Sequence, residues 1–273
     1  MSELTKETYI TDHSFLSFTR ISKFMSCEAA AAVNYKTEPT PAMLMSSYVD
    51  AYFSKELEEF KTKHPEIFTK TETLKADFLQ AEEIIKRIES DPVMMYYMSG
   101  EKQVIMTGEI FGRKFKAKMD SYKKGEFIVD LKVMKDFQPV WTGYGKENFV
   151  EAYLYHIELA IFQEIVRQNT GEQLPCYICG ITKEKPSDVG IWQIPQPQLD
   201  AAMKIIENNI GRIGDILDGK VQPHRCESCE YCRLTKKAKV LNYYFAGLTG
   251  DQLREEGIES DDPLLKKEEE KNA

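Results

Sequence analysis

The chain has 273 residues, of which 42% are hydrophobic and 11% aromatic; this is enough apolar material for a sizeable core and excludes a disordered chain. Acidic residues outnumber basic ones by 44 to 36, so the formal net charge of −8 excludes attraction of the whole molecule to nucleic acid. No apolar run reaches the roughly 18 to 20 residues that cross a bilayer, and the N-terminus lacks a signal-peptide layout, so we expect a cytoplasmic protein with no membrane partner.

Helical spacing of apolar residues dominates the first third of the chain. Breakers at Pro39, Pro41 and Pro65 separate three expected helices. These helices cover residues 15–35, 42–60 and 71–90. Short β-branched and aromatic runs then predict strands over residues 104–111, 114–122 and 127–133. Downstream we expect a helix over 148–169 capped by Gly171, strands over 176–182 and 189–194, and a helix over 197–217.

This order of elements predicts an α/β protein in which helices flank a central sheet. We expect one domain over residues 1–240, which includes the helical N-terminal part and a C-terminal cysteine cluster. A C-terminal extension follows over residues 241–273, and its last dozen residues carry charges without an apolar face, so we expect them to be disordered.

The predicted strand over residues 127–133 carries charges in an unusual place. Its alternation puts Asp130 and Lys132 on the face opposite the apolar residues. A three-residue turn containing Gly125 would place Asp120 of the preceding strand directly across from Asp130. Two facing carboxylates repel each other, and a divalent cation that bridges them would offset the repulsion. The alternative is a surface hairpin whose charged residues face water.

These residues resemble a known family. Asp120 followed by Asp130-Leu131-Lys132 is similar to the D…(D/E)-x-K core of the PD-(D/E)xK nucleases. The residues from Gly108 to Gly112, which lead into Lys116-Ala117-Lys118-Met119-Asp120, resemble its phage exodeoxyribonuclease VIII-like and RecB-like branch. The resemblance spans residues 15–239 and implies a restriction-endonuclease-like core, a central mixed sheet flanked by helices.

The resemblance also implies roles for the acidic residues. Asp120 and Asp130 would bind Mg²⁺ or Mn²⁺, and Lys132 would assist the attack of water. Glu109 is a candidate for an additional acidic ligand. Asp50 stands where the branch often has a histidine, and its carboxylate remains a suitable ligand for a hard cation; the alternative is a solvated helix residue.

DNA-contacting residues are implied less directly. Glu158 and Phe162 occupy the positions of the family's Gln-x-x-x-Tyr pair, and we expect Phe162 to lie in the core instead. Lys116 and Lys118 would supply local positive charge. Lys183 would meet a phosphate, or is simply an exposed lysine.

A C-x₂-C-x₂-C run, typical of three corners of a [4Fe-4S] cluster, lies near the C-terminus. Its members are Cys226, Cys229 and Cys232. By the resemblance, Cys27 would be the fourth ligand. Zn²⁺ on the same four thiolates and unligated cysteines are the alternatives. Two further cysteines lie on a predicted strand and are expected to be buried without metal, Cys176 and Cys179.

The resulting expectation is a metal-dependent exonuclease that acts on ends of linear double-stranded DNA from 5′ to 3′. By family resemblance, it would work with a single-strand annealing protein in recombination, form a homo-oligomer, and act in a bacterial host cell if phage-encoded. The alternatives are a structure-specific endonuclease or single-strand exonuclease on the same fold, and a non-catalytic, zinc-stabilised nucleic-acid-binding protein.

Overall fold

The computed structural model divides the chain into two compact units. Unit 1 comprises residues 1–16 and 38–206, and unit 2 comprises residues 17–37 and 207–273. The described residues are 4–142, 145–238 and 243–258. The predicted disorder of the last dozen residues lies outside the described residues.

Unit 1 contains all the strands of the described chain. The strands are β1 (Val104–Ile110), β2 (Arg113–Met119), β3 (Ser121–Lys123), β4 (Phe127–Met134), β5 (Val140–Thr142), β6 (Gly145–Glu147), β7 (Cys176–Thr182) and β8 (Val189–Ile194). The helices of unit 1 are α1 (Lys6–Thr11), α4 (Pro41–Phe53), α5 (Leu57–Lys63), η1 (Pro65–Ile67), α6 (Ala76–Glu89), α7 (Pro92–Tyr97), α8 (Phe149–Ala152) and α9 (Tyr155–Thr170). A further helix, α10 (Gln196–Leu217), contains the boundary between the two units.

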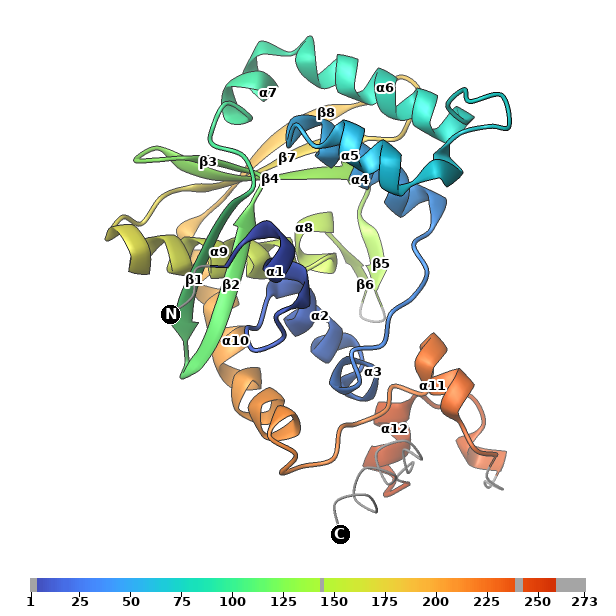
Figure 1. Cartoon of the computed structure of the whole chain (residues 1–273). Coiled ribbons are helices and arrows are strands. Elements are labelled where there is room, and N and C mark those ends of the chain that lie inside the picture. The colour runs from blue at the N-terminus through green and yellow to red at the C-terminus, as the bar shows by residue number, and fades with distance from the viewer. Residues whose placement is uncertain (1–3, 143–144, 239–242, 259–273) are drawn as a thin grey trace. The chain divides into compact units, whose positions relative to one another are not determined.

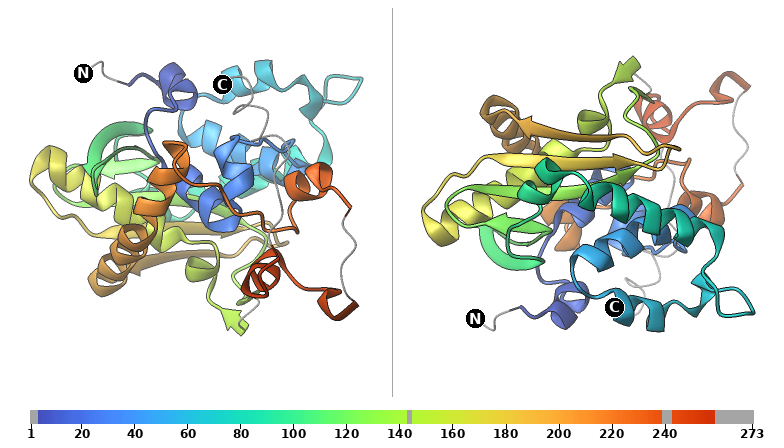
Figure 2. Two further views of the ribbon diagram at one scale, coloured as in Figure 1. Left: turned by 90° about the horizontal axis from the view of Figure 1, so that it is seen from below. Right: turned by 90° about the horizontal axis from the view of Figure 1, so that it is seen from above.

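The central sheet has the strand order β3-β4-β7-β8. β4 and β7 run parallel, whereas the other neighbouring pairs are antiparallel, so the sheet is mixed. Helices α4 and α6 cover one face and α9 covers the other (Figures 1 and 2). These layers confirm the expected α/β, restriction-endonuclease-like core.

Strand β4 lies at the centre of this core and is buried on both faces. Phe127, Val129 and Leu131 pack into the cluster formed with α4 and α6. Ile128, which is fully buried, and Asp130, only 4% exposed, lie on the face toward α9. The alternation predicted from the sequence is therefore confirmed, while the alternative of a water-facing hairpin is wrong.

One predicted strand is in fact two. The run over residues 114–122 breaks at Asp120: β2 pairs with β1 in a separate two-stranded sheet, and β3 pairs with β4. Period-two alternation continues through this break, so the sequence pattern does not reveal the change of partner.

Two of the three long predicted N-terminal helices are also interrupted. The helix expected over residues 15–35 breaks at Cys27, whose φ of −162° is extended. The helix expected over residues 42–60 ends at Phe53, and Lys55 follows with a left-handed φ of 61°. The apolar spacing continues from α4 into α5 because Leu57 and Phe60 pack against the same cluster as α4.

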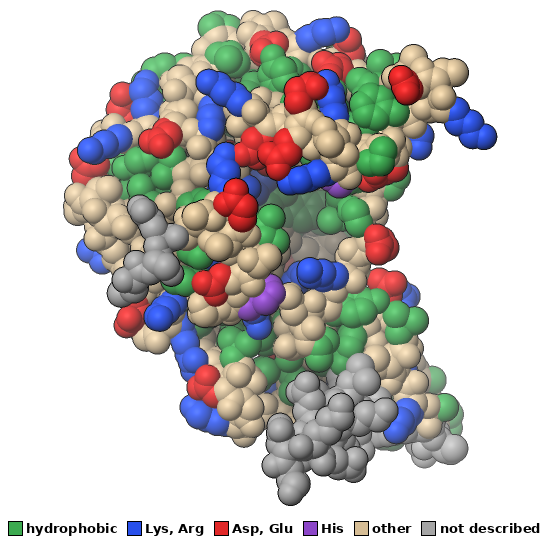
Figure 3. Space-filling view, viewed as in Figure 1, with side chains coloured by type: hydrophobic (Ala, Val, Ile, Leu, Met, Phe, Trp, Pro, Cys, Tyr) green, Lys and Arg blue, Asp and Glu red, His purple; other side chains and the backbone are tan. Residues whose placement is uncertain are grey.

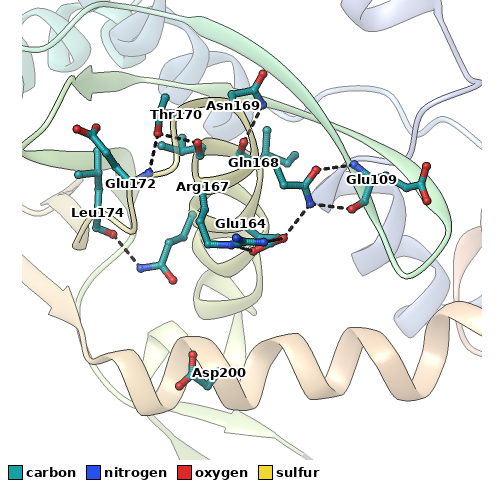
Figure 4. Close-up of polar contacts among 12 residues, drawn as sticks. Glu109, Glu164, Arg167, Gln168, Asn169, Thr170, Glu172, Leu174 and Asp200 are labelled. Atoms are coloured by element: carbon teal, nitrogen blue, oxygen red, sulfur yellow. Dashed lines mark hydrogen bonds and ion pairs between the residues drawn. The ribbon is translucent and has the colours of Figure 1, made fainter.

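Side chains near the end of α9 tie this helix to β1 (Figure 4). The Gln168 amide donates to the Glu109 carbonyl at 2.7 Å and accepts from the Glu109 backbone N–H at 2.9 Å. Asn169 donates to the Thr107 carbonyl at 2.9 Å. A Cβ at Gly108 would lie 2.6 Å from the Gln168 side-chain oxygen, so glycine is needed for this close approach.

Unit 2 is helical in its described part. Besides the end of α10 it contains α2 (Phe18–Ser26), α3 (Glu28–Ala32), α11 (Glu230–Thr235), η2 (Tyr243–Phe245) and α12 (Gly250–Glu255). Two parallel hydrogen bonds of 2.7 Å join the Arg212 guanidinium to the Glu28 carboxylate, and this ion pair fixes α3 against α10. No helix in the described residues is long and apolar enough to cross a membrane.

Gly171 ends α9 as predicted, with a left-handed φ of 78°, and a Cβ here would meet no atom within 4 Å. We expect Gly171→Ala to lower the free energy of unfolding by about 1 kcal/mol, because only backbone strain is added. Gly211 is exposed within α10 and its surroundings are equally open, so Gly211→Ala should raise that free energy by about 0.5–1 kcal/mol. Urea denaturation would measure both, and effects of the same sign would contradict these assignments.

Candidate active site

Asp120 lies where the chain passes from β2 to β3. Its carboxylate accepts a 2.9 Å hydrogen bond from the backbone N–H of Leu131. Lys123 pairs with Phe127, so three residues form the turn around Gly125, as the sequence predicts. The pairing of Ser121 with Val129, continued by one residue, places Asp120 across from Asp130.

A buried group of charges occupies the space between β4 and α9. The Lys132 ammonium lies 2.5 Å from a carboxylate oxygen of Asp130 and 2.7 Å from one of Glu158. The Lys132 ammonium also lies 4.6 Å from the centre of the Tyr155 ring, a cation–π contact. One lysine is thus held by two carboxylates and an aromatic face.

The buried charges shift one another's pKa. Burial lowers the pKa of Lys132, but the charges of Asp130 and Glu158 outweigh it and raise this pKa well above its usual value. Burial and the negative charge of Glu158 raise the pKa of Asp130. Lys132 therefore stays charged, and the group as a whole favours a further positive charge nearby.

Gln103 connects the two remaining carboxylates. Its amide donates to Asp50 at 3.3 Å and to Asp120 at 3.0 Å. The residue is only 4% exposed and has a left-handed φ of 54°. Sequence reasoning missed it, and its one signal was an amide residue immediately before a strand.

Asp50 projects from α4 into this polar region. Burial, followed by the negative charge of Asp120, raises the pKa of Asp50 to about 7. The charges of Lys118 and Lys132 oppose this rise. Asp50 is therefore a constrained carboxyl and not a solvated helix residue.

An N-terminal segment also borders the carboxylates. Burial raises the pKa of the Tyr9 phenol, and the charges of Glu158 and Asp120 add to the rise. Lys116 is only 5% exposed, and its ammonium donates to the backbone carbonyls of Tyr9 and, at 2.6 Å, of Asp12. The expectation that Lys116 contacts DNA is therefore wrong for this structure, since its ammonium fixes the N-terminal segment instead.

Three further residues at positions matched to the family lie away from these carboxylates. Glu109 is exposed near the far end of β1 from Gln103, about 20 Å away along the strand, and its carboxylate points away from α9 (Figure 4). It does not join Asp120 and Asp130, so its expected role as a ligand is wrong. The Lys183 ammonium donates to the Ala42 carbonyl at 2.8 Å, a structural contact. Phe162 is buried, as expected.

The carboxyl groups of Asp50 and Asp130 both lie near that of Asp120, and the three are the candidate ligands of a divalent cation. Asp50 and Asp120 both accept from the Gln103 side-chain amide, and the buried Oδ2 atom of Asp130 contacts the Lys132 ammonium. Mg²⁺ commonly uses one or two protein carboxylates together with water and substrate phosphate. Figure 3 shows acidic and basic side chains of the described residues interspersed over the face in view.

The raised pKa of Asp50 predicts a pH-dependent stability. The native state keeps a proton that the unfolded chain releases near its ordinary value of 3.8, so the stability of the metal-free protein falls as pH rises from about 4 to about 7. Asp50→Asn should therefore raise the free energy of unfolding at pH 8 by on the order of 1 to 3 kcal/mol and change it little at pH 4. Urea unfolding with chelator measures this. An equal gain at both pH values would contradict the assignment.

Unit 2 holds a second candidate site. The sulfur atoms of Cys27, Cys226, Cys229 and Cys232 all lie within 4.8 Å of one another. The Cys27 and Cys232 sulfurs are 3.5 Å apart, and those of Cys226 and Cys232 are 3.9 Å apart. A four-thiolate group of this kind could bind a metal ion, as the spacing of the cysteines predicts.

The loop around this group favours the thiolate form of Cys226, whereas burial raises the pKa of Cys27 and of Cys232. Burial opposes ionisation of Cys226, but hydrogen bonds from the Ser228 hydroxyl and backbone and from the Cys229 backbone lower its pKa to about 6. The Arg225 guanidinium braces the loop by donating to the Cys232 carbonyl at 2.7 Å. A tetrahedral ion with metal–sulfur distances of about 2.3 Å holds its sulfurs about 3.8 Å apart, close to the 3.5 and 3.9 Å separations found here. A [4Fe-4S] cluster uses the same four ligands at wider spacing.

The other two cysteines are buried in β7 and are not part of this group. Burial raises the pKa of Cys176, and it raises that of Cys179 to about 12. The Cys176 sulfur lies 3.7 Å from the Leu159 carbonyl. The expected burial without chelation is confirmed.

Cys27→Ala should remove the metal from the cysteine group and destabilise unit 2, because Cys27 lies 199 or more residues before the other three ligands, and binding free energy is here folding free energy. Cys179→Ala is the matched control, a buried cysteine outside the group. Elemental analysis for zinc and iron, visible absorbance and thermal melting would be measured. Equal metal contents in the two variants would contradict the assignment.

Comparisons with known proteins place the chain in a family. A family model described as a PDDEXK-like domain of unknown function matches residues 17–235, which include both candidate sites. A solved structure from Eubacterium rectale, named as a candidate exonuclease, has a TM-score of 0.85 and 42% identity, and the match covers 91% of this chain and 100% of that chain. Another solved structure, SSO0001, has a TM-score of 0.32 and 13% identity over 82% of this chain and 96% of that chain. Among curated proteins, none matches the chain significantly.

Proposed function

Because this chain belongs to the family of PDDEXK-like nuclease domains, we propose that it is a metal-dependent deoxyribonuclease that degrades linear double-stranded DNA from its ends. The observation that carries the proposal is the grouping of Asp120, Asp130 and Lys132 where β3 meets β4. The name of the Eubacterium rectale protein supports exonuclease activity over other uses of the fold.

Asp50, Asp120 and Asp130 would hold Mg²⁺ or Mn²⁺. When bound, such an ion supplies Lewis-acid stabilisation of charge on the scissile phosphate. The residues themselves supply position and charge: the Leu131 N–H orients Asp120, and Gln103 keeps Asp50 beside it. Burial keeps this arrangement partly shielded from water, which strengthens its electrostatic effect.

Lys132 would neutralise charge that develops on the phosphate. Glu158 and Asp130 hold its ammonium from two directions, so its position is set before substrate arrives. At this position Glu158 provides a carboxylate in place of the amide of related enzymes. We assign it to positioning Lys132, and its earlier expected role in contacting DNA becomes secondary.

Finer features of the proposal rest on the resemblance of residues 108–120 to phage recombination nucleases. They are degradation from 5′ to 3′, supply of single strands to an annealing protein, and a homo-oligomeric enzyme. None of the six cysteines forms a disulfide, which suits the reducing cytoplasm of a bacterial host.

Lys132→Ala and Asp120→Asn should each lower the rate of DNA cleavage at least about 100-fold, because each removes preorganised charge at the phosphate. Lys86→Ala is the control, since Lys86 is an exposed lysine on α6 paired with Glu83. Linear and closed-circular duplexes would be incubated with Mg²⁺, Mn²⁺ or chelator. Loss of linear DNA alone, and only with metal, is the expected result.

Other outcomes would contradict specific parts of the proposal. Nicking of the circle would replace the exonuclease by an endonuclease. Full activity in both site variants would refute the assignment of these residues, and no cleavage by the wild type in any condition would refute the nuclease itself.

A further inference from the structure

Two tyrosines mark the junction between α8 and α9. Leu154 separates them and adopts a left-handed φ of 60°, which turns the chain sharply before α9 begins. The rings of Tyr153 and Tyr155 lie side by side as a result, with centroids 5.6 Å apart and planes inclined by 39°. These two rings form a short aromatic pair on the surface of unit 1.

The two tyrosine rings extend from Lys132 to the exposed surface. The Tyr155 ring lies under the Lys132 ammonium, and burial raises the pKa of its phenol to about 12. Tyr153 is 47% exposed. The two ring separations together place the Tyr153 ring within about 10 Å of the Lys132 ammonium, or roughly three base steps of 3.4 Å.

Another exposed aromatic side chain lies nearby in the fold. β5 packs against α8, and its Trp141 is 75% exposed. In the β5–β6 pairing, Lys146 stands opposite Trp141. Exposed rings interleaved with a basic residue are typical of surfaces that bind unpaired nucleic acid strands.

We propose that Tyr153 stacks on an unpaired base of the DNA strand within three nucleotides of the scissile phosphate, with Tyr155 supporting the Tyr153 ring from beneath. This inference rests on the proposed nuclease function and adds a substrate class to it. A ring can stack on a base only where that base has left its helical neighbours, so the site takes a frayed or single-stranded end. Tyr153 is thus a specificity-determining residue that acts on the base and not on the phosphate.

The test compares a DNA substrate that carries normal bases with one that carries abasic positions. Linear duplexes would carry a short unpaired end whose first three nucleotides are either normal or abasic. Tyr153→Ala should lower kcat/KM on the normal substrate by about 5- to 150-fold, the range found for loss of one stacked base. On the abasic substrate the same variant should equal the wild type within about twofold, because no base remains to stack.

Two controls separate stacking from a structural role. Tyr153→Phe keeps the ring and should retain wild-type kcat/KM on both substrates. Tyr96→Ala removes a tyrosine of similar exposure, 49%, which packs on Phe127 about 16 Å along β4 from Lys132, and it should also leave kcat/KM unchanged. Thermal melting of each variant checks the fold.

A loss of equal size on normal and abasic substrates, or no loss on either, would overturn the proposal while leaving the nuclease intact. Absence of cleavage by the wild type would instead refute the proposed function. In that case fluorescence anisotropy with the same two oligonucleotides in chelator still decides the stacking: weaker binding of only the normal strand by Tyr153→Ala supports it, and unchanged binding overturns it.

Discussion

The structure depends on charged side chains that project from a strand whose two faces are both buried. β4 lies between β3 and β7 and between two layers of helices, yet it carries Asp130 and Lys132 on the face toward α9. Burial of an unpaired charge would cost several kcal/mol, so each of these charges needs a partner. Glu158 on α9 meets that need, and α9 is in turn fixed to β1 through Gln168 and Asn169.

Further hydrogen bonds connect this group of charges to the elements around it. Gln103 joins Asp50 on α4 to Asp120 at the end of β2, and the Lys116 ammonium holds the N-terminal segment that brings Tyr9 to the carboxylates. A surplus of carboxylates remains after these pairings. That surplus of negative charge favours a cation nearby, which is the physical basis of the proposed metal site.

The cysteine group in unit 2 lies among short helices and not in a buried sheet. Its four sulfurs come from the N-cap of α3, from the loop that leads into α11 and from the first turn of α11. Helices of five or six residues have little stability of their own. Backbone and hydroxyl donors to the Cys226 sulfur favour the thiolate form there. If the four thiolates bind a metal, as their grouping allows, metal binding and local folding would be one event.

Sequence alone determined a substantial part of this protein. Alternation in residues 127–133 put Asp130 and Lys132 on one face, the spacing of Cys226, Cys229 and Cys232 predicted one group of ligands, and Phe162 was expected in the core. Strands β7 and β8 and the cap at Gly171 also match their predictions. These features are local: they follow from periodicity, spacing and backbone preference within a few residues.

Only the tertiary structure decided the rest. It broke one predicted strand at Asp120 because its two halves pair with different partners, and it removed Glu109 and Lys116 from the set of available site residues. It also brought in Gln103, Tyr9 and Tyr153, which no local pattern singles out. A side chain's partners are set by which elements pack together, and that depends on contacts between residues far apart in the chain, which short-range periodicity does not encode.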